Sequence, residues 1–217
     1  LANSNVDDND LCYITYIADN IASASDRKQR EDNGDGSRGY VRNIPFESIF
    51  NILNGNKEKK VYKPDVLSSK SEINYPTGEN IIFSESFYGK IVDNIKDAIR
   101  GINYTKEYIN SLMQVMESNL TFIPSSTDKS QYVDISLYDH SKMTAAFGLC
   151  IEQYLVENEI TNYNEELFKK TKEFYKKKVF GLLSIDLSGI QSFIYNISDE
   201  KALKNLRARS LYLEMLM

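Results

Sequence analysis

The sequence predicts a mostly α-helical domain followed by the beginning of an α/β domain, which makes the chain α+β overall. Apolar residues recur at helical spacing over residues 11–22 and, more strongly, over residues 143–155, and both patterns predict buried helices. Residues 179–187, VFGLLSIDL, form a nearly continuous apolar run. Such a run is expected of a strand buried on both faces, and it marks the change to α/β structure.

The first third of the chain is predicted to hold one helix and several loops. The helix over residues 11–22 buries its isoleucines on one face. Residues 26–40, DRKQREDNGDGSRGY, combine charges with the turn-forming pairs Asn-Gly and Asp-Gly, which predicts an exposed loop. The polar stretch that follows as far as Gly78 contains two prolines, so we expect hairpin or loop structure there.

Three more helices are predicted in the middle of the chain. They cover residues 87–102, with Gly101 where the helix is expected to close, and residues 104–120, with Pro124 just beyond. The third carries the strongest apolar stripe of the chain: Met143, Ala146, Phe147, Cys150, Ile151, Tyr154 and Leu155. These spacings follow one face of a helix.

A domain boundary is predicted near residue 178. Residues 165–178 are rich in Lys and Glu and predict a solvated connecting helix. The apolar run after it leads into SGIQSFIYNI and a further helix, as at the opening of an α/β unit. We therefore expect a helical domain over residues 1–160, a connecting helix over residues 161–178, and a second domain beginning at residue 179.

Composition places the chain among soluble globular proteins. Hydrophobic residues make up 41% and charged residues 26%, with no apolar run long enough to span a bilayer, so no membrane association is expected. The net charge of -5 argues against broad, nonspecific attraction to nucleic acid. Cys12 and Cys150 fit no metal-ligand motif and are predicted to be reduced core residues of a cytoplasmic protein. The opening LANSN carries no secretory signal, and both ends are expected to be cuts in a longer protein.

His140 is the only histidine, and it lies on the apolar side of a predicted helix. A lone histidine there is most often a hydrogen-bonded core residue, and the alternative is a metal ligand whose companions lie elsewhere. Asp19 stands at the margin of the apolar face of the first helix. Taken alone, it is more simply a solvated or capping carboxylate than a ligand.

Taken together, three stretches resemble one family. LYDHSKMTAA and YIADNIAS are similar to the first-histidine helix and the last-aspartate helix of HD-type phosphohydrolases, but in reversed order. That order resembles the permuted HD domain in the large, polymerase-like subunit of type III CRISPR effector complexes, of type III-A in particular. GLLSIDLSGIQSFIYNI with ALKNLRARSLYLEML resembles the first strand and helix of the first palm domain in the same subunit.

The resemblance implies a fold and two activities. The family joins an HD domain to two palm domains of ferredoxin-like fold, related to nucleotide cyclases. It implies metal-dependent cleavage of single-stranded DNA by the HD domain and conversion of ATP to cyclic oligoadenylates by the palms. Guide RNA, target RNA and the other subunits of the effector complex are the implied partners, and target recognition is the implied trigger.

The resemblance also implies site residues. His140 and Asp19 match ligand positions for a divalent metal, of which Mn, Ni, Co or Mg suits imidazole and carboxylate. The family's HD pair would precede Leu1, and its GGDD hairpin would follow Met217, so this segment is expected to be inactive alone. Asp186, Ser188 and Gly189 match the end of the first palm strand, where they would meet ATP, or else form a packed strand-ending turn.

Two other readings of the sequence stay open. One is an HD phosphohydrolase joined to a cyclase-like domain and acting on small nucleotides. The other is a helical scaffold that keeps the shape of an HD domain without catalysis. Arg207 and Arg209 are expected to lie on a helix surface or between domains rather than on ATP.

Overall fold

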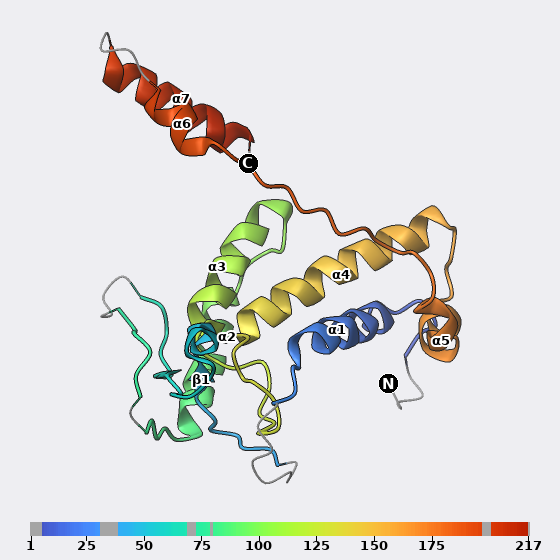
Figure 1. The fold of residues 1–217 in the computed structure, drawn as a ribbon. Coiled ribbons are helices and arrows are strands. Elements are labelled where there is room, and N and C mark those ends of the chain that lie inside the picture. Colours follow the sequence, from blue (N-terminus) through green and yellow to red (C-terminus); the bar gives the residue numbers. More distant parts are fainter. Residues whose placement is uncertain (1–5, 31–38, 69–72, 79, 197–200, 217) are drawn as a thin grey trace. The chain divides into compact units, whose positions relative to one another are not determined.

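The fold was established as a computed structural model, which describes residues 6–30, 39–68, 73–78, 80–196 and 201–216. The described chain is mostly helical and carries one small antiparallel sheet, so the α+β class is confirmed in this coarse sense (Figure 1). The HD-like and palm assignments remain predictions. The chain divides into two compact units, Leu1–Phe180 and Gly181–Met217.

Two long helices that are far apart in sequence form the centre of the first unit. Helix α1 (Cys12–Asp26) lies along helix α4 (Leu137–Glu157) (Figure 1). The helices are antiparallel, because the last residue of α1 meets the first turn of α4, whereas Ala18 in the middle of α1 lies near Gly148. The predicted helices over residues 11–22 and 143–155 are thereby confirmed.

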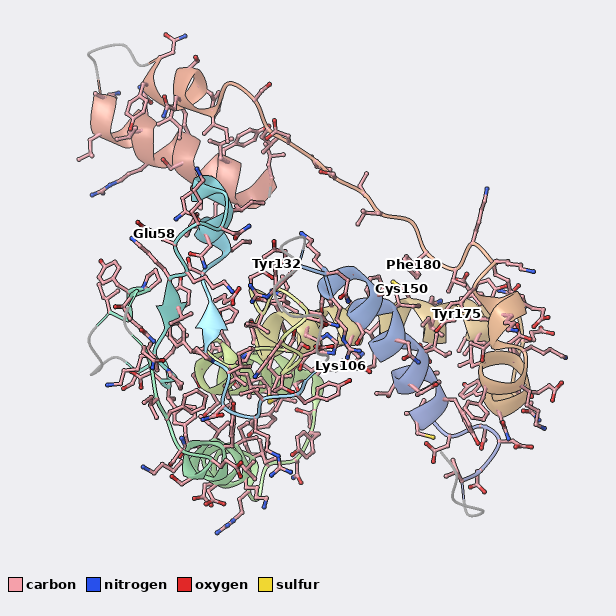
Figure 2. All side chains as sticks on the ribbon, turned by 60° about the horizontal axis from the view of Figure 1, so that its bottom comes forward. Glu58, Lys106, Tyr132, Cys150, Tyr175 and Phe180 are labelled. Atoms are coloured by element: carbon pink, nitrogen blue, oxygen red, sulfur yellow. The ribbon has the colours of Figure 1, made fainter. Side chains whose placement is uncertain are left out.

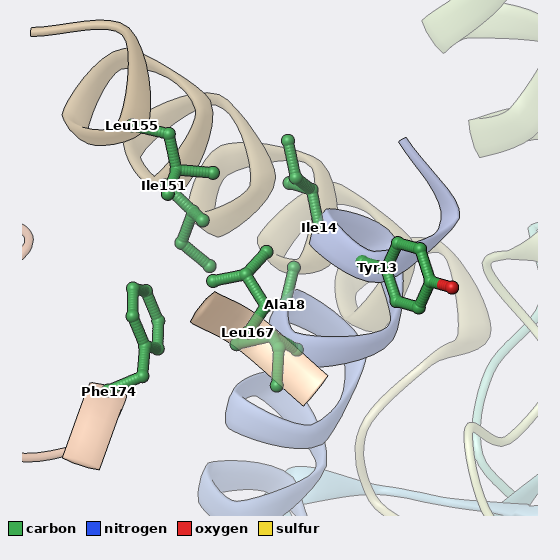
Figure 3. Close-up of a cluster of buried hydrophobic side chains, with 8 residues drawn as sticks. Tyr13, Ile14, Ala18, Ile151, Leu155, Leu167 and Phe174 are labelled. Carbon is green, nitrogen blue, oxygen red and sulfur yellow. The ribbon is translucent and has the colours of Figure 1, made fainter. Parts of the chain in front are cut away.

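The core between these helices is a cluster of side chains from three parts of the chain (Figure 3). Helix α1 contributes Ile17 and Ala18, and α4 contributes Ile151 and Leu155, all with no exposed surface. The other members are Tyr13, Ile14, Leu167 and Phe174. Fully burying an aliphatic side chain stabilises a fold by about 1.5–3 kcal/mol before entropy is subtracted, so this cluster fixes α1 against α4.

Helix α4 begins at a residue that caps it strongly. Ser136 is buried, and its hydroxyl accepts a hydrogen bond from the backbone N–H of Asp139 (2.9 Å). The same hydroxyl donates to the Asp139 carboxylate (2.7 Å). The N–H of His140 donates to the carbonyl of Ser136 (3.0 Å), so the cap also fixes the position of His140 in the first turn of α4.

Residues 161–178, expected as a connecting helix, form a π-helical turn, η3 (Asn164–Lys169), and a short helix, α5 (Thr171–Phe174). Most of their charged side chains are exposed, although that of Glu166 is only 15% exposed, and Leu167 and Phe174 reach the core cluster of α1 and α4. The first unit therefore includes this segment.

A second cluster joins helices α2 (Ser86–Ile99) and α3 (Ile109–Leu120) to the start of α4. The short helix η2 (Lys106–Tyr108) precedes α3. The buried members of the cluster are Ile91, Leu120, Ile123 and Tyr138. Both predicted helices are confirmed, and Gly101 follows α2 with a φ of +74°, a conformation that suits glycine at a helix end.

The expected hairpin is present as strands β1 (Phe46–Glu47) and β2 (Val61–Tyr62), with the helix η1 (Ile49–Asn54) between them. The rings of Phe46 and Tyr62 stack across the strands. Glu47 forms a largely buried ion pair with Arg30, which ties the hairpin to the segment after α1. The Asn-Gly and Asp-Gly turns predicted in the loop over residues 26–40 lie outside the described residues.

The predicted strand over residues 179–187 is wrong for this chain. Residues 179–187 are extended but pair with no described strand, and Leu182 and Ile185 are 97% and 76% exposed. A buried strand needs neighbouring strands for its backbone groups and covered faces for its side chains. The described part of the second unit offers only helices α6 (Ile190–Tyr195) and α7 (Ala202–Leu216).

The apolar stripe on α4 is only half buried. Met143 and Cys150 are exposed, so the prediction that Cys150 is a core residue is wrong, and Cys12 is partly buried. Figure 2 labels Cys150 on α4. The stripe is wider than the contact with α1, which uses mainly Ile151 and Leu155. Among the described residues, none of the helices combines the length and the apolar character that crossing a bilayer requires.

Candidate functional site

The candidate site lies where the first turn of α4 meets the second half of α1. His140 is the fourth residue of α4, after the cap at Ser136. Asp19 and Asp26 both belong to α1 and are seven residues apart, which is close to two full helical turns. Both carboxylates therefore project from the same face of α1, toward α4.

The structure brings the imidazole of His140 between these two carboxylates. Nε2 of His140 lies 2.9 Å from Oδ1 of Asp19, and Nδ1 lies 2.7 Å from Oδ2 of Asp26. Both distances are those of short, charge-assisted hydrogen bonds. Asp19 and His140, which the sequence pairs only through its resemblance, are thus in contact across 121 positions of the chain.

The two edges of the imidazole ring meet different surroundings. The side chains of His140 and Asp26 are each only 11% exposed, whereas that of Asp19 is 52% exposed. The Asp26 edge therefore faces the interior between the helices, and the Asp19 edge opens to solvent. His140 is neither sealed in an apolar core nor fully hydrated.

The carboxylates decide the protonation of His140. Burial acts to lower its pKa, but the hydrogen bonds that the ring makes to Asp26 and Asp19, together with the negative charges of these carboxylates, outweigh burial, so the pKa of His140 lies above its ordinary value. When the ring is protonated, each of its two nitrogens can donate to one carboxylate.

Part of this arrangement suits a divalent cation. Adjacent ligands of an octahedral ion bonded at about 2.1 Å are about 3 Å apart, close to the 2.9 Å between His140 Nε2 and Asp19 Oδ1. Asp26 lies on the other edge of the ring, so it and Asp19 do not face one common ion. Accordingly, no three His, Cys, Asp or Glu side chains within the described ranges are grouped so as to hold a metal.

Two buried hydroxyls belong to residues one helical turn from the candidate ligands. The Oγ of Ser23 and the Oγ1 of Thr144 have no hydrogen-bond partner among the described residues. Ser23 lies one helical turn beyond Asp19, and Thr144 lies one turn beyond His140, so each shares a face with a candidate ligand. Buried polar atoms are normally satisfied, and unpaired ones call for an explanation such as water or an ion. The residues present fit part of a hydrated cation site.

Sequence reasoning missed Asp26. The signal was its spacing of seven residues from Asp19, which places both carboxylates on one helix face. This spacing is informative only if α1 includes Asp26. The sequence DRK at residues 26–28 is typical of the beginning of a charged loop, whereas α1 continues as far as Asp26.

Of the three residues predicted for ATP, Ser188 and Gly189 line one groove, whereas Asp186 is not among the residues that line it. Asp186 is exposed in the extended segment before α6. Ser188 and Gly189 border a groove of about 220 Å³ between α6 and α7, whose other lining residues are Leu187, Ile190, Phe193, Tyr212, Leu213 and Leu216. Gly189 has a φ of +76° and precedes α6, so the turn there suits glycine. Arg209 stacks on Phe193 and is bound within the second unit.

Comparison with known proteins gives matches to one group. The family model described as Csm1 subunit domain B matches residues 179–217. A protein of Enterococcus italicus named CRISPR system single-strand-specific deoxyribonuclease Cas10/Csm1 (subtype III-A) is 43% identical over 224 residues, covering 100% of this chain and 30% of the relative. Proteins of the same name from Streptococcus thermophilus and Mycobacterium tuberculosis are 42% and 41% identical, covering 95% and 93% of this chain. The chain thus spans 30% or less of these relatives.

Proposed function

Because this chain matches part of the Cas10/Csm1 proteins of subtype III-A along almost its whole length, we propose that it contributes to their nuclease. In the complete protein it would supply half of an HD-type metal site that cleaves single-stranded DNA. The observation that carries the proposal is the 2.9 Å contact between His140 Nε2 and Asp19 Oδ1, made by two helices whose sequences are distant.

The proposed ligands are Asp19 and His140. A divalent cation, of which Mn, Ni, Co or Mg suits these donors, would supply Lewis acidity and an activated water for attack on phosphorus. Asp19 offers a partly exposed carboxylate, which faces solvent and hence an incoming phosphodiester. His140 would offer Nε2 on the same side once the ring has lost its second proton, and the first turn of α4 holds it there. The remaining ligands would come from other parts of the complete protein.

Cleavage of a single-stranded DNA oligonucleotide by the complete protein in its complex tests this role. With Mn²⁺ present, His140→Ala and Asp19→Asn should each lower the cleavage rate at least roughly 100-fold, as expected for a lost metal ligand. Met143→Ala is the matched control, because Met143 is exposed on the same helix one turn away. Unchanged cleavage in His140→Ala would remove this residue from the site and favour a non-catalytic scaffold.

The second unit supports a further proposal, which is ATP binding for cyclic oligoadenylate synthesis. Its support is the match of residues 179–217 to Csm1 subunit domain B, together with the glycine turn at Ser188 and Gly189 beside Asp186. Asp186 would approach the metal bound to the triphosphate, and the turn would approach a phosphate. Asp186→Ala should weaken ATP binding in a calorimetric titration, with Ser184→Ala as control, and equal affinities would refute the role.

The partners proposed for the complete protein are the other subunits of a type III-A CRISPR complex, together with its guide RNA and target RNA. This proposal rests on the names of the relatives, which place them in a CRISPR system of subtype III-A. An HD phosphohydrolase acting on small nucleotides is the competing function. It would hydrolyse a cyclic nucleotide and leave the DNA oligonucleotide intact.

A further inference from the structure

We infer that Asp26 is a positioning residue that holds His140 in the tautomer a metal site requires. This inference rests on the proposed function. Asp26 would accept the proton-bearing Nδ1 edge of the ring and leave the lone pair of Nε2 directed to the side of Asp19. It would act through His140 rather than on the cation or the DNA.

The geometry separates the roles of the two aspartates. Nδ1 of His140 lies 2.7 Å from Asp26, the shorter of the two contacts, and both side chains are about nine-tenths buried. Asp19 lies at the opposite edge and is half exposed. A solvent-borne cation therefore approaches from the Asp19 side, while Asp26 is shielded by the ring itself.

The chemistry of histidine ligands makes this division specific. A neutral imidazole carries one proton, so only one nitrogen can donate while the other offers a lone pair. Histidines that bind metals almost always donate their second ring N–H to a carboxylate, a carbonyl or water, which fixes both the tautomer and the ring orientation. Asp26 is the buried carboxylate at this nitrogen, whereas Asp19 occupies the ligand side.

The rigidity of both helices supports the same role. Asp26 is the last residue of α1, and α1 is fixed by the core cluster around Ile17 and Ala18. His140 is fixed by the cap at Ser136. A ring held on one edge by a buried partner has little freedom to turn, so the position of Nε2 is set before any cation binds.

The test measures the Mn²⁺ affinity of the complete protein by calorimetry. The Mn²⁺ binding that is lost in the His140→Ala variant is assigned to this site. Asp26→Asn should weaken that binding about 10- to 100-fold, because it replaces the carboxylate with a neutral amide that no longer fixes the tautomer. The Mn²⁺ concentration for half-maximal DNA cleavage should rise by the same factor, while the rate at saturating Mn²⁺ stays within a few-fold. Asp26→Glu should restore part of the affinity.

Glu157→Gln is the matched control, because it removes the charge of an exposed carboxylate at the other end of α4, far from the ring. It should leave Mn²⁺ affinity unchanged. Wild-type affinity in Asp26→Asn would overturn the inference and leave the proposed function standing. A purely structural role for Asp26 would also overturn the inference. It would show as a lower DNA cleavage rate that excess Mn²⁺ does not restore, together with faster hydrogen exchange of the α1 amides. Failure of His140→Ala to remove any Mn²⁺ binding would refute the site itself.

Discussion

Gly148 of α4 faces Ala18 of α1, and a Cβ atom built at position 148 would lie 3.9 Å from the Cβ of Ala18. Cγ2 of Ile14 lies at 3.9 Å from the same position. Both are ordinary van der Waals distances, so the contact between the two helices leaves room for one methyl group at position 148.

Gly148→Ala should therefore stabilise the α1–α4 pair. Glycine within a helix costs roughly 0.5–1 kcal/mol relative to alanine, and here the added methyl group gains contacts without displacing an atom. Hydrogen exchange of the α1 and α4 amides should show an opening free energy higher by that amount. Gly148→Leu is the control and should lower it by about 1–3 kcal/mol through overpacking. No gain in the alanine variant would contradict the fit.

Ser136→Ala should weaken the start of α4. The substitution removes the hydroxyl that accepts from the Asp139 N–H, and loss of such a cap costs about 1 kcal/mol. Exchange of the first-turn amides, including that of His140, should accelerate roughly fivefold, which corresponds to that energy. Ser141→Ala is the control, because its hydroxyl only bonds back to the carbonyl of Leu137. Equal effects of the two changes would argue against the cap.

The α1–α4 contact should weaken as pH rises. Because the pKa of His140 is raised in the folded chain, its protonated form favours folding. This contribution is fully present below the unfolded pKa of about 6.5 and is lost as pH rises through the higher folded pKa. The check is hydrogen exchange of the α1 and α4 amides in metal-free protein. The opening free energy should be higher in the wild type than in His140→Gln, and this difference should be largest at low pH. A difference that stays constant between pH 5.5 and 8.5 would contradict the two carboxylate contacts.

Phe174→Ala should be the most damaging change in residues 161–178. Phe174 is 2% exposed and fills the core cluster between α1 and α4, and truncation of a buried phenylalanine costs about 3–5 kcal/mol. Tyr175→Ala is the neighbouring control, because Tyr175 is half exposed. Proteolysis of the native protein should be much faster in the first variant only. Similar rates in both would mean that this segment is not part of the core.

The sequence predicts those elements whose pattern is local. The isoleucine spacing in α1 and the stripe in α4 are properties of single helices, so both were found, and the resemblance supplied the pairing of Asp19 with His140. The role of Asp26 depends on where α1 ends, which is decided by packing rather than by the charges of DRK. The prediction that Cys150 is a core residue is wrong because an apolar stripe shows which face of a helix is apolar. The stripe does not show how much of that face a neighbouring helix covers. The run at residues 179–187 meets no described partner strand, and a strand is defined by its partners.

Asp19 and His140 are 121 positions apart in the sequence, and this separation has a consequence for synthesis of the protein. Helix α1 is complete at Asp26, but α4, on which its apolar face packs, ends only at Glu157. At ribosomal elongation rates this interval lasts on the order of ten seconds. During that time the isoleucines of α1 have no partner and Asp19 stands without His140. The contact between His140 and Asp19 can therefore form only after α4 has been synthesised.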